Sequence, residues 1–252
     1  MSGQRRIAGV LGGMGPAATL DFMARVHALR AGGTDQDHIR MIVDLNPGVP
    51  DRNAAAAGTG PSPGPTLAQM ARGLEHAGAD FLVMPCNAAH AFAEAIITAS
   101  DLPLLDMIEA TTDAALSAAP QARRVGVMAV YAALDSGLYQ RALAAHGVEA
   151  VVPEGALREQ QMAAIYAVKS GDLTAGRAGL AAVAEALVAQ GADVLIAGCS
   201  EVPLALADGD TPVPMINSTQ VLAEKTVECA TAAAADFSVC AYCHPRHGHR
   251  GG

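Results

Sequence analysis

Two cysteines in this chain stand in matching sequence surroundings. Residues 78–86 read Gly-Ala-Asp-Phe-Leu-Val-Met-Pro-Cys, and residues 191–199 read Gly-Ala-Asp-Val-Leu-Ile-Ala-Gly-Cys. In each stretch a turn leads into an apolar run, so Cys86 and Cys199 are each expected directly after a buried strand. Ligands of open parallel sheets bind beyond the carboxyl ends of the strands. If the two halves of the chain face each other, both thiols approach one ligand from opposite sides.

Two opposed thiols suit proton transfer at a carbon atom. One of them, as thiolate, removes a proton from one face of the carbon, and the other, as thiol, returns a proton to the opposite face without a cofactor. Thiolates are favoured at helix N-termini. Residues 87–92 are predicted to start a helix after Cys86, and Ser200 to cap a helix after Cys199. A lone buried cysteine is more often a packing residue, which is our interpretation of Cys229; the matched pair favours catalysis.

The elements that position these cysteines follow from an alternation of apolar runs and Ala/Leu-rich stretches. Apolar strands alternating with helices predict an α/β fold with parallel sheets covered on both faces. The predicted helices include residues 17–30, 66–76 and 177–189. The predicted strands are 7–11, 40–45, 81–84, 102–105, 125–129, 148–152, 194–197 and 213–216.

The internal repeat extends beyond the cysteines. Ile7–Leu11 matches Val125–Ala129, and residues 103–106 match residues 214–217. We therefore expect two similar α/β lobes of about four parallel strands each, residues 1–118 and 119–217, with a boundary near residues 118–123.

Three segments lie outside this scheme. The last helix, residues 218–235, is expected to pack back on the first lobe. Residues 47–65 are rich in Pro and Gly and are predicted to form a long loop, a type of segment that often acts as a lid. Residues 236–252 are predicted to be a disordered tail.

Composition excludes several classes of protein. Hydrophobic residues make up 51% and charged residues 16% of the 252 residues, which is typical of a folded globular chain. The formal net charge of −9 disfavours nucleic acid and anionic membranes as partners. No apolar run is long enough to span a bilayer, and the first one is too short for a signal peptide. We therefore expect a cytoplasmic protein whose five cysteines are thiols.

The tail carries a motif of its own. Cys240-x-x-Cys243-His244 matches the form of a c-type haem attachment site, and His247 and His249 could complete a zinc site instead. Haem attachment requires export, which the sequence does not predict. We interpret the tail as functionless and expect no metal at the functional site.

Taken together, the motifs resemble those of the aspartate/glutamate racemase family, and most of all its aspartate racemase branch. The similarity runs from about residue 5 to about residue 230. The motifs that carry it are Gly12-Gly13-Met14-Gly15-Pro16, Asn46-Pro47, Pro50-Asp51-Arg52, Pro85-Cys86-Asn87 with Ala89-His90, Met107-Ile108-Glu109, Ser136-Gly137-Leu138-Tyr139, Ile165-Tyr166 with Lys169, and Gly198-Cys199 with Glu201.

The resemblance implies two flavodoxin-like lobes, no cofactor and a homodimer. It implies that Cys86 and Cys199 are the acid/base pair that racemises a small acidic amino acid, namely aspartate, glutamate or a close relative. It also implies that Arg52 and Lys169 bind the substrate, which fits the affinity of guanidinium and ammonium groups for carboxylates. The full expected substrate-binding set is Met14, Arg52, Asn87, Ala88, Lys169, Ser200 and Glu201.

Several positions depart from the family pattern. Ala88 replaces a threonine, and residues 129–133 lack the usual hydroxyls, so Tyr131 is a candidate replacement donor. These departures leave two alternatives open. One is a two-cysteine isomerase of the same superfamily that acts on another carboxylate, as maleate isomerases do. The other is a non-catalytic relative that binds an amino acid. His90 is interpreted as a structural residue or as an orienting residue for the site.

Overall fold

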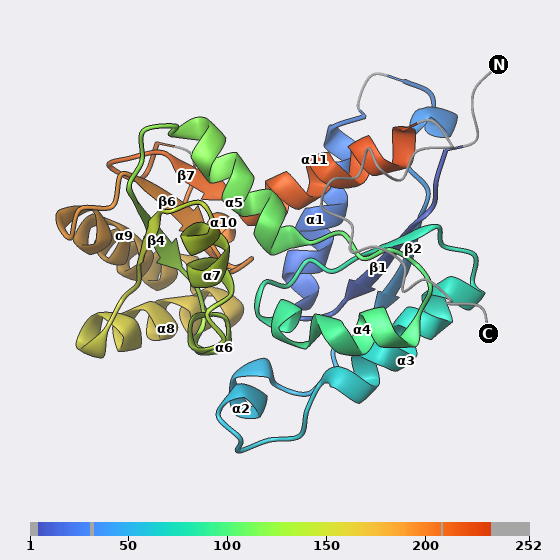
Figure 1. Ribbon diagram of the computed structural model, residues 1–252, viewed down its shortest axis with the longest axis horizontal. Coiled ribbons are helices and arrows are strands. Elements are labelled where there is room, and N and C mark those ends of the chain that lie inside the picture. Colours follow the sequence, from blue (N-terminus) through green and yellow to red (C-terminus); the bar gives the residue numbers. More distant parts are fainter. Residues whose placement is uncertain (1–4, 31–32, 208, 233–252) are drawn as a thin grey trace.

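The fold is that of a computed structural model, which describes residues 5–30, 33–207 and 209–232. The chain forms two α/β lobes that lie side by side (Figure 1). Each lobe has one parallel sheet, of three strands in the first and four in the second. This confirms the predicted α/β class with two parallel sheets. Among the described residues, no helix combines the length and the apolar character needed to cross a membrane.

The first lobe is built on strands in the order β2-β1-β3. Their bounds are β1 Ala8–Gly12, β2 Met41–Leu45 and β3 Phe81–Val83. Leu67, Leu74 and Leu82 are among the buried residues that pack between this sheet and its helices. The helical elements of this part of the chain are α1 Pro16–Ala28, η1 Asp35–Asp37, α2 Arg52–Ala56, α3 Gly64–His76, η2 Ala88–Phe92 and α4 Ala93–Ala99.

The second lobe repeats the same strand order, β5-β4-β6-β7. Its strands are β4 Arg124–Met128, β5 Glu149–Val151, β6 Val194–Ala197 and β7 Met215–Asn217. The central strands β4 and β6 are almost completely buried, as expected for a sheet covered on both faces. The helices of this part are α6 Tyr131–Asp135, α7 Leu138–Ala145, α8 Gly155–Lys169, α9 Leu173–Ala189 and α10 Val202–Ala205.

The repeated sequence forms the same local contacts in both lobes. The Asp80 carboxylate accepts a hydrogen bond from the backbone N–H of Ile7, and the Asp193 carboxylate accepts one from Arg124. The backbone N–H groups of Arg123 and Arg124 hold the pKa of Asp193 below its ordinary value. Each aspartate therefore bonds the start of the strand that leads to a cysteine to the central strand. This bond fixes the register of the two strands and so the position of the cysteine at the end of its strand.

The predicted fourth strand of the first lobe is reduced to a single bridge between Leu82 and Leu104. The next groups along the ladder have other partners. The Met107 N–H donates to Nε2 of His90 at 3.3 Å, and the Met84 carbonyl accepts from the Cys86 N–H at 2.7 Å. Pairing stops because the loop that carries the first cysteine uses both groups.

The segment predicted as a long loop at residues 47–65 is only partly a loop. It contains α2, which begins at Arg52 because the Asp51 side chain accepts a hydrogen bond from the Ala54 N–H. Aspartate at such a position satisfies an amide that the helix itself leaves unpaired. α3 then begins at Gly64, inside the predicted loop.

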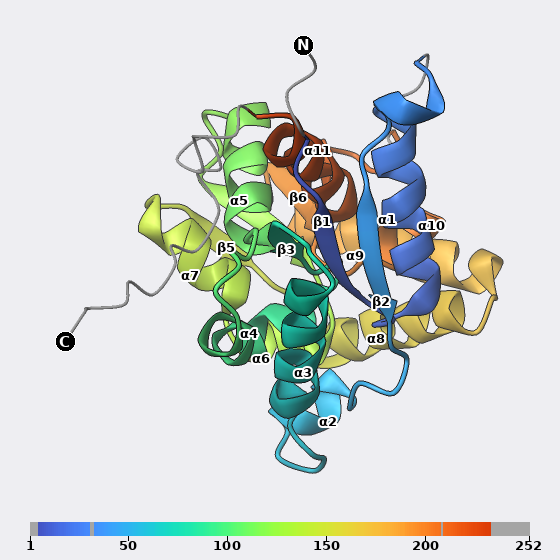
Figure 2. The ribbon, with the colours of Figure 1, turned by 90° about the vertical axis from the view of Figure 1, so that its right-hand side faces the viewer.

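Two long helices lie at the junction of the lobes. α5 (Met107–Ala118) leads from the first lobe to β4, and α11 (Ser218–Thr231) packs against both α1 and α5. Figure 1 shows α5 and α11 meeting at an angle where the two lobes join, and Figure 2 shows the same two helices next to each other from the side. Residues 233–235, which we expected to extend the last helix, and the predicted tail with its Cys/His motif lie outside the described residues.

The expectation that all five cysteines are thiols is wrong. Cys229, within α11, is disulfide-bonded, whereas Cys86 and Cys199 are free. A pattern of isolated cysteines in the sequence gives no geometric sign of which of them meet.

Candidate active site

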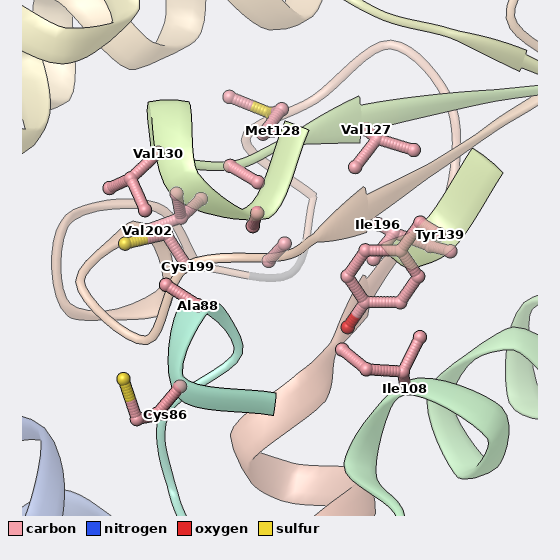
Figure 3. Packing of buried hydrophobic residues seen from close by; sticks show 14 of the residues in the cluster. Cys86, Ala88, Ile108, Val127, Met128, Val130, Tyr139, Ile196, Cys199 and Val202 are labelled. Atoms are coloured by element: carbon pink, nitrogen blue, oxygen red, sulfur yellow. The ribbon is translucent and has the colours of Figure 1, made fainter. Parts of the chain in front are cut away.

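Both free cysteines line one pocket between the lobes. The pocket is partly open to solvent, and the space in it that the centre of a water molecule can reach is about 30 Å³. Figure 3 shows the side chains of Cys86 and Cys199 projecting to the same side, with Ala88 between them in this view. The lining residues are Met14, Asp51, Arg52, Asn53, Cys86, Asn87, Ala88, Val130, Tyr166, Lys169, Gly198, Cys199, Ser200 and Glu201.

Cys86 lies in the loop that follows β3. It is followed by the short 3-10 helix η2 and not by the predicted α-helix start, and α4 begins only at Ala93. Burial raises the pKa of the Cys86 thiol, while the positive charge of Arg52 and a hydrogen bond from the Ala89 N–H act in the opposite direction. A guanidinium and one amide, more than a helix terminus, are therefore what favours a thiolate at Cys86.

His90 supports the loop that carries Cys86. Its Nε2 accepts a hydrogen bond from the Met107 N–H, so Nδ1 carries the proton and donates to the Cys86 carbonyl oxygen at 2.9 Å. The ring is buried. It ties the first cysteine to the start of α5 and does not line the pocket.

Cys199 has a carboxylate as its immediate neighbour. Its Sγ lies 2.9 Å from Oε2 of Glu201, so the thiol donates a hydrogen bond to the carboxylate. Burial raises the pKa of the Cys199 thiol well above its ordinary value, and the charge and hydrogen bond of Glu201 raise it further. This site therefore favours the protonated thiol.

Lys169 balances the charge of Glu201. Its Nζ lies 3.2 Å from Oε1 of Glu201, and that carboxylate is 7% exposed. Burial acts to lower the pKa of Lys169, but the negative charge of Glu201, together with that of either cysteine when it ionises, outweighs burial and raises the pKa. Lys169 is therefore a fixed positive charge in the pocket, and it acts to lower the pKa of both cysteines.

Arg52, at the start of α2, lines the pocket. Its Nη1 donates to the carbonyl oxygens of Val49 and Pro50 at 3.3 and 3.1 Å. Its Nε is buried and has no hydrogen-bond partner among the described residues. A buried donor without a partner is costly, and the positive charge of Arg52 stands in the wall of the pocket.

Met14 belongs to a glycine turn that the fold constrains tightly. A side chain on Gly13 would lie within 2.6 Å of backbone atoms of Asn46, so only glycine fits beside the Asn46-Pro47 segment. The Gly13 N–H donates to Oγ1 of Thr19, so this amide is not directed at a ligand. Met14 itself is buried and lines the pocket.

The predicted Ser200 cap is wrong. α10 begins at Val202 and no side chain caps it, because the Ser200 hydroxyl instead lies 3.4 Å from the Pro85 carbonyl oxygen. This contact joins the residue after Cys199 to the residue before Cys86. The sequence favoured a local cap because a serine before a helix usually caps it. The hydrogen bond from Ser200 to Pro85, more than one hundred positions away, leaves no pattern near Ser200 that could predict it.

All nine residues predicted for the site line this one pocket. Tyr131, considered as a replacement donor, does not line it; its ring lies under the Arg158 guanidinium, 4.6 Å from it. Lining residues that were not among the predicted nine are Asp51, Asn53, Val130, Tyr166 and Gly198. Asp51, Tyr166 and Gly198 belong to motifs that matched the family, so a signal for them existed, whereas Asn53 had none.

No group of three or more His, Cys, Asp or Glu side chains suited to a metal ion occurs among the described residues. The pocket instead combines two thiols, two cations and two carboxylates, which is a set suited to moving protons beside an anionic ligand.

Comparison with known proteins agrees with this geometry. The family described as Asp/Glu/hydantoin racemase matches residues 11–226. The chain belongs to this family. It is 27% identical over 226 residues to the broad specificity amino-acid racemase RacX of Bacillus subtilis, covering 87% of this chain and 96% of that protein. The chain is thus an amino-acid racemase.

Solved structures give the same picture. Picrophilus torridus aspartate racemase has a TM-score of 0.80 and 26% identity, with 94% of this chain and 99% of that one covered. The glutamate racemase isoform RacE1 of Bacillus anthracis has a TM-score of 0.61 and 18% identity, over 88% and 80% of the two chains, and shares the fold.

Proposed function

We propose that the protein racemises an acidic amino acid, namely aspartate, glutamate or a close relative, without a cofactor, and that Cys86 and Cys199 form its acid/base pair. The observation that carries the proposal is that the two free thiols, one from each lobe, line a single pocket together with Arg52 and Lys169.

The two thiols differ in the way this reaction requires. Arg52 favours the thiolate of Cys86, and Glu201 favours the thiol of Cys199. In one direction the Cys86 thiolate takes the α-proton, and the Cys199 thiol gives its proton to the opposite face of the same carbon. The reverse direction exchanges the roles. One proton leaves and one is returned, so the substrate changes only its configuration.

The cations support an acidic substrate. Arg52 lines the pocket on the side of the first lobe, where its guanidinium can attract a carboxylate of the ligand. Lys169 adds a second positive charge on the far lobe, where Glu201 already holds it in place. Two cations on opposite walls favour a ligand with two carboxylates over a neutral amino acid.

The proposal is tested by incubating each enantiomer of aspartate, glutamate and their amides with the enzyme in heavy water. Chiral chromatography and mass spectrometry then measure inversion and α-deuteration. We expect inversion with one deuteron gained per turnover. Cys86→Ser and Cys199→Ser should each lower the rate by about 10²–10⁴-fold, the usual contribution of an acid/base group, with the fold checked by circular dichroism.

Two other results would replace the proposal. If maleate or another carboxylate is isomerised and no amino acid is, the reaction belongs to a carboxylate isomerase. If an acidic amino acid binds but gains no deuterium, the pocket only binds its ligand.

The proposal includes a homodimer, as the family resemblance implies, and a location in the cytoplasm, as the apolar runs of the sequence led us to expect. Analytical ultracentrifugation of the full chain tests the first point, and cell fractionation tests the second.

A further inference from the structure

One buried tyrosine contacts the loops of both cysteines. Tyr139, in α7, is 1% exposed and is among the largest fully buried side chains. Its ring packs on Gly198, the residue before Cys199, so closely that a Cβ at Gly198 would lie 2.9 Å from Cε2 of the ring. Figure 3 shows the ring beside Ile196 of the strand that leads to Cys199.

The hydroxyl group of the same side chain reaches the other cysteine loop. It donates a 2.6 Å hydrogen bond to Oδ1 of Asn87, the residue after Cys86. Burial raises the pKa of Tyr139, so the phenol keeps the proton it donates. One rigid side chain therefore spans the distance between the residues adjacent to the two thiols.

The bond continues through a buried chain of donors and acceptors. Nδ2 of Asn87 donates to the Ser218 hydroxyl at 3.1 Å, which in turn donates to the Ala197 carbonyl oxygen at 2.6 Å. The chain starts beside Cys86 and returns to the strand that ends before Cys199. It also gives both the oxygen and the nitrogen of the Asn87 amide a buried partner.

We propose that Tyr139 is a positioning residue that sets the separation of the two thiols, with the Tyr139–Asn87 bond as a link between the two cysteine loops. The inference rests on the proposed two-thiol mechanism. A displacement of about 1 Å costs a reaction about 10²-fold. Tyr139 contacts Gly198 through its ring and Asn87 through its hydroxyl, so it can prevent such a displacement of the two cysteine loops.

The two halves of the reaction should respond differently to loss of this link. Arg52 and Cys86 belong to the same lobe, so a substrate held by Arg52 stays in place relative to Cys86. Cys199 belongs to the other lobe and moves relative to both. For the enantiomer that Cys86 deprotonates, exchange of the α-proton with solvent should continue while delivery of a proton to the opposite face fails.

The experiment compares Tyr139→Phe with Tyr131→Phe, the same change at a tyrosine that does not line the pocket. Each enantiomer is incubated in heavy water, and two rates are measured: inversion, and deuteration of the enantiomer that has not inverted. For Tyr139→Phe we expect the ratio of deuteration with retention to inversion to rise at least about tenfold for one enantiomer. Tyr131→Phe should leave the ratio unchanged.

This ratio separates positioning from a merely structural effect. Partial unfolding lowers both rates by the same factor and leaves the ratio unchanged, so an unchanged ratio in Tyr139→Phe overturns the inference.

If the wild-type protein racemises nothing, the proposed function fails, and the inference is judged by hydrogen exchange of the backbone. Segments 86–90 and 198–202 should then both exchange faster in Tyr139→Phe than in Tyr131→Phe, and no change in either segment overturns it.

Discussion

Cys86 and Cys199 occupy matching positions in the two lobes, yet their neighbours carry opposite charges. A guanidinium acts on Cys86 and a carboxylate accepts a hydrogen bond from Cys199. The repeat places the two thiols in equivalent positions. Their acidities differ because Arg52 acts to lower the pKa of Cys86, whereas Glu201 raises the pKa of Cys199. Groups whose environments separate their pKa values are suited to acid and base roles in one reaction.

This inequality predicts the pH dependence of kcat/KM. The pKa of Cys86 is raised by burial, and that of Cys199 is raised further by burial and by Glu201. The active form has Cys86 ionised and Cys199 protonated, so activity rises through the first pKa and falls through the second. Glu201→Gln removes a charge that raises the pKa of Cys199. The alkaline limb should therefore move to lower pH, as measured by kcat/KM between pH 6 and about pH 11.

A matched control is Glu185→Gln, which removes the same charge from an exposed position of α9. Its profile should overlay that of the wild type. If Glu201→Gln leaves the alkaline limb where it was, the carboxylate does not govern the protonation of Cys199.

Arg52→Lys tests the second cation of the pocket. Lysine keeps the charge but loses the planar fork and the bonds to Val49 and Pro50. A hydrogen bond to a charged group contributes about 1.5–3 kcal/mol, so kcat/KM for an acidic amino acid should fall about 10–150-fold. If Arg52 binds the side-chain carboxylate, the value for the corresponding amide should change much less. An equal loss for both substrates would assign Arg52 to the α-carboxylate, and Arg72→Lys on the surface serves as control.

The sequence predicted residue identities at the site better than residue roles. The motifs brought all nine predicted residues to one pocket. They did not reveal that Ser200 contacts Pro85 or that the Asn87 amide is bonded to Tyr139 and Ser218. These partners are distant in sequence, and only the packing of the lobes decides where a hydroxyl or amide finds them.

At the scale of elements, the repeat depends on close packing between the central strand and the helix beside it. Gly9 and Gly126 hold equivalent places: a Cβ on Gly9 would lie 2.8 Å from Cβ of Ala79, and one on Gly126 would lie 3.1 Å from Cβ of Ala192. Both alanines belong to the Gly-Ala-Asp turns that precede the cysteine strands. The Gly-Ala-Asp motif therefore forms a turn and also provides the alanine that packs closely on the glycine of the central strand.

Gly9→Ala should destabilise the protein by about 1–3 kcal/mol, because the added methyl group meets an atom that only a backbone shift can move. Gly73→Ala is the matched control, since Gly73 lies inside α3 with open space around it. That change should stabilise by about 0.5–1 kcal/mol. Urea denaturation of the two variants measures both values, and equal effects of the same sign would contradict the packing argument.

Seven of the eight predicted strands form, because buried parallel strands leave continuous apolar runs in a sequence. The eighth, at residues 102–105, fails through a competing bond from the Met107 N–H to His90. α2 was missed since it is short and lies in a Pro/Gly-rich segment, where only Asp51 signals a helix start. Apolar periodicity thus predicts elements that a core stabilises and misses those that a few polar bonds decide.

At the scale of the whole molecule, the lobes meet through side chains that the repeat does not share. Tyr139 and Asn87 join them through one hydrogen bond, and Asn53 joins them through another. Oδ1 of Asn53, in α2, accepts a hydrogen bond at 2.9 Å from the Ala132 N–H in the first turn of α6. A helix of one lobe is thus capped by a side chain of the other.

This trans cap predicts that Asn53 holds the wall that carries Arg52. Asn53→Ala leaves the Ala132 N–H without its partner and frees α2 from α6, at a cost of about 1 kcal/mol. We expect KM for the acidic amino acid to rise about fivefold, and backbone hydrogen exchange to quicken in residues 51–57 and 131–135 together. Thr59→Ala is the control, because its hydroxyl bonds to Ala54 within the same segment. Faster exchange in residues 51–57 alone would mean that the bond to α6 stabilises α2 without joining the lobes.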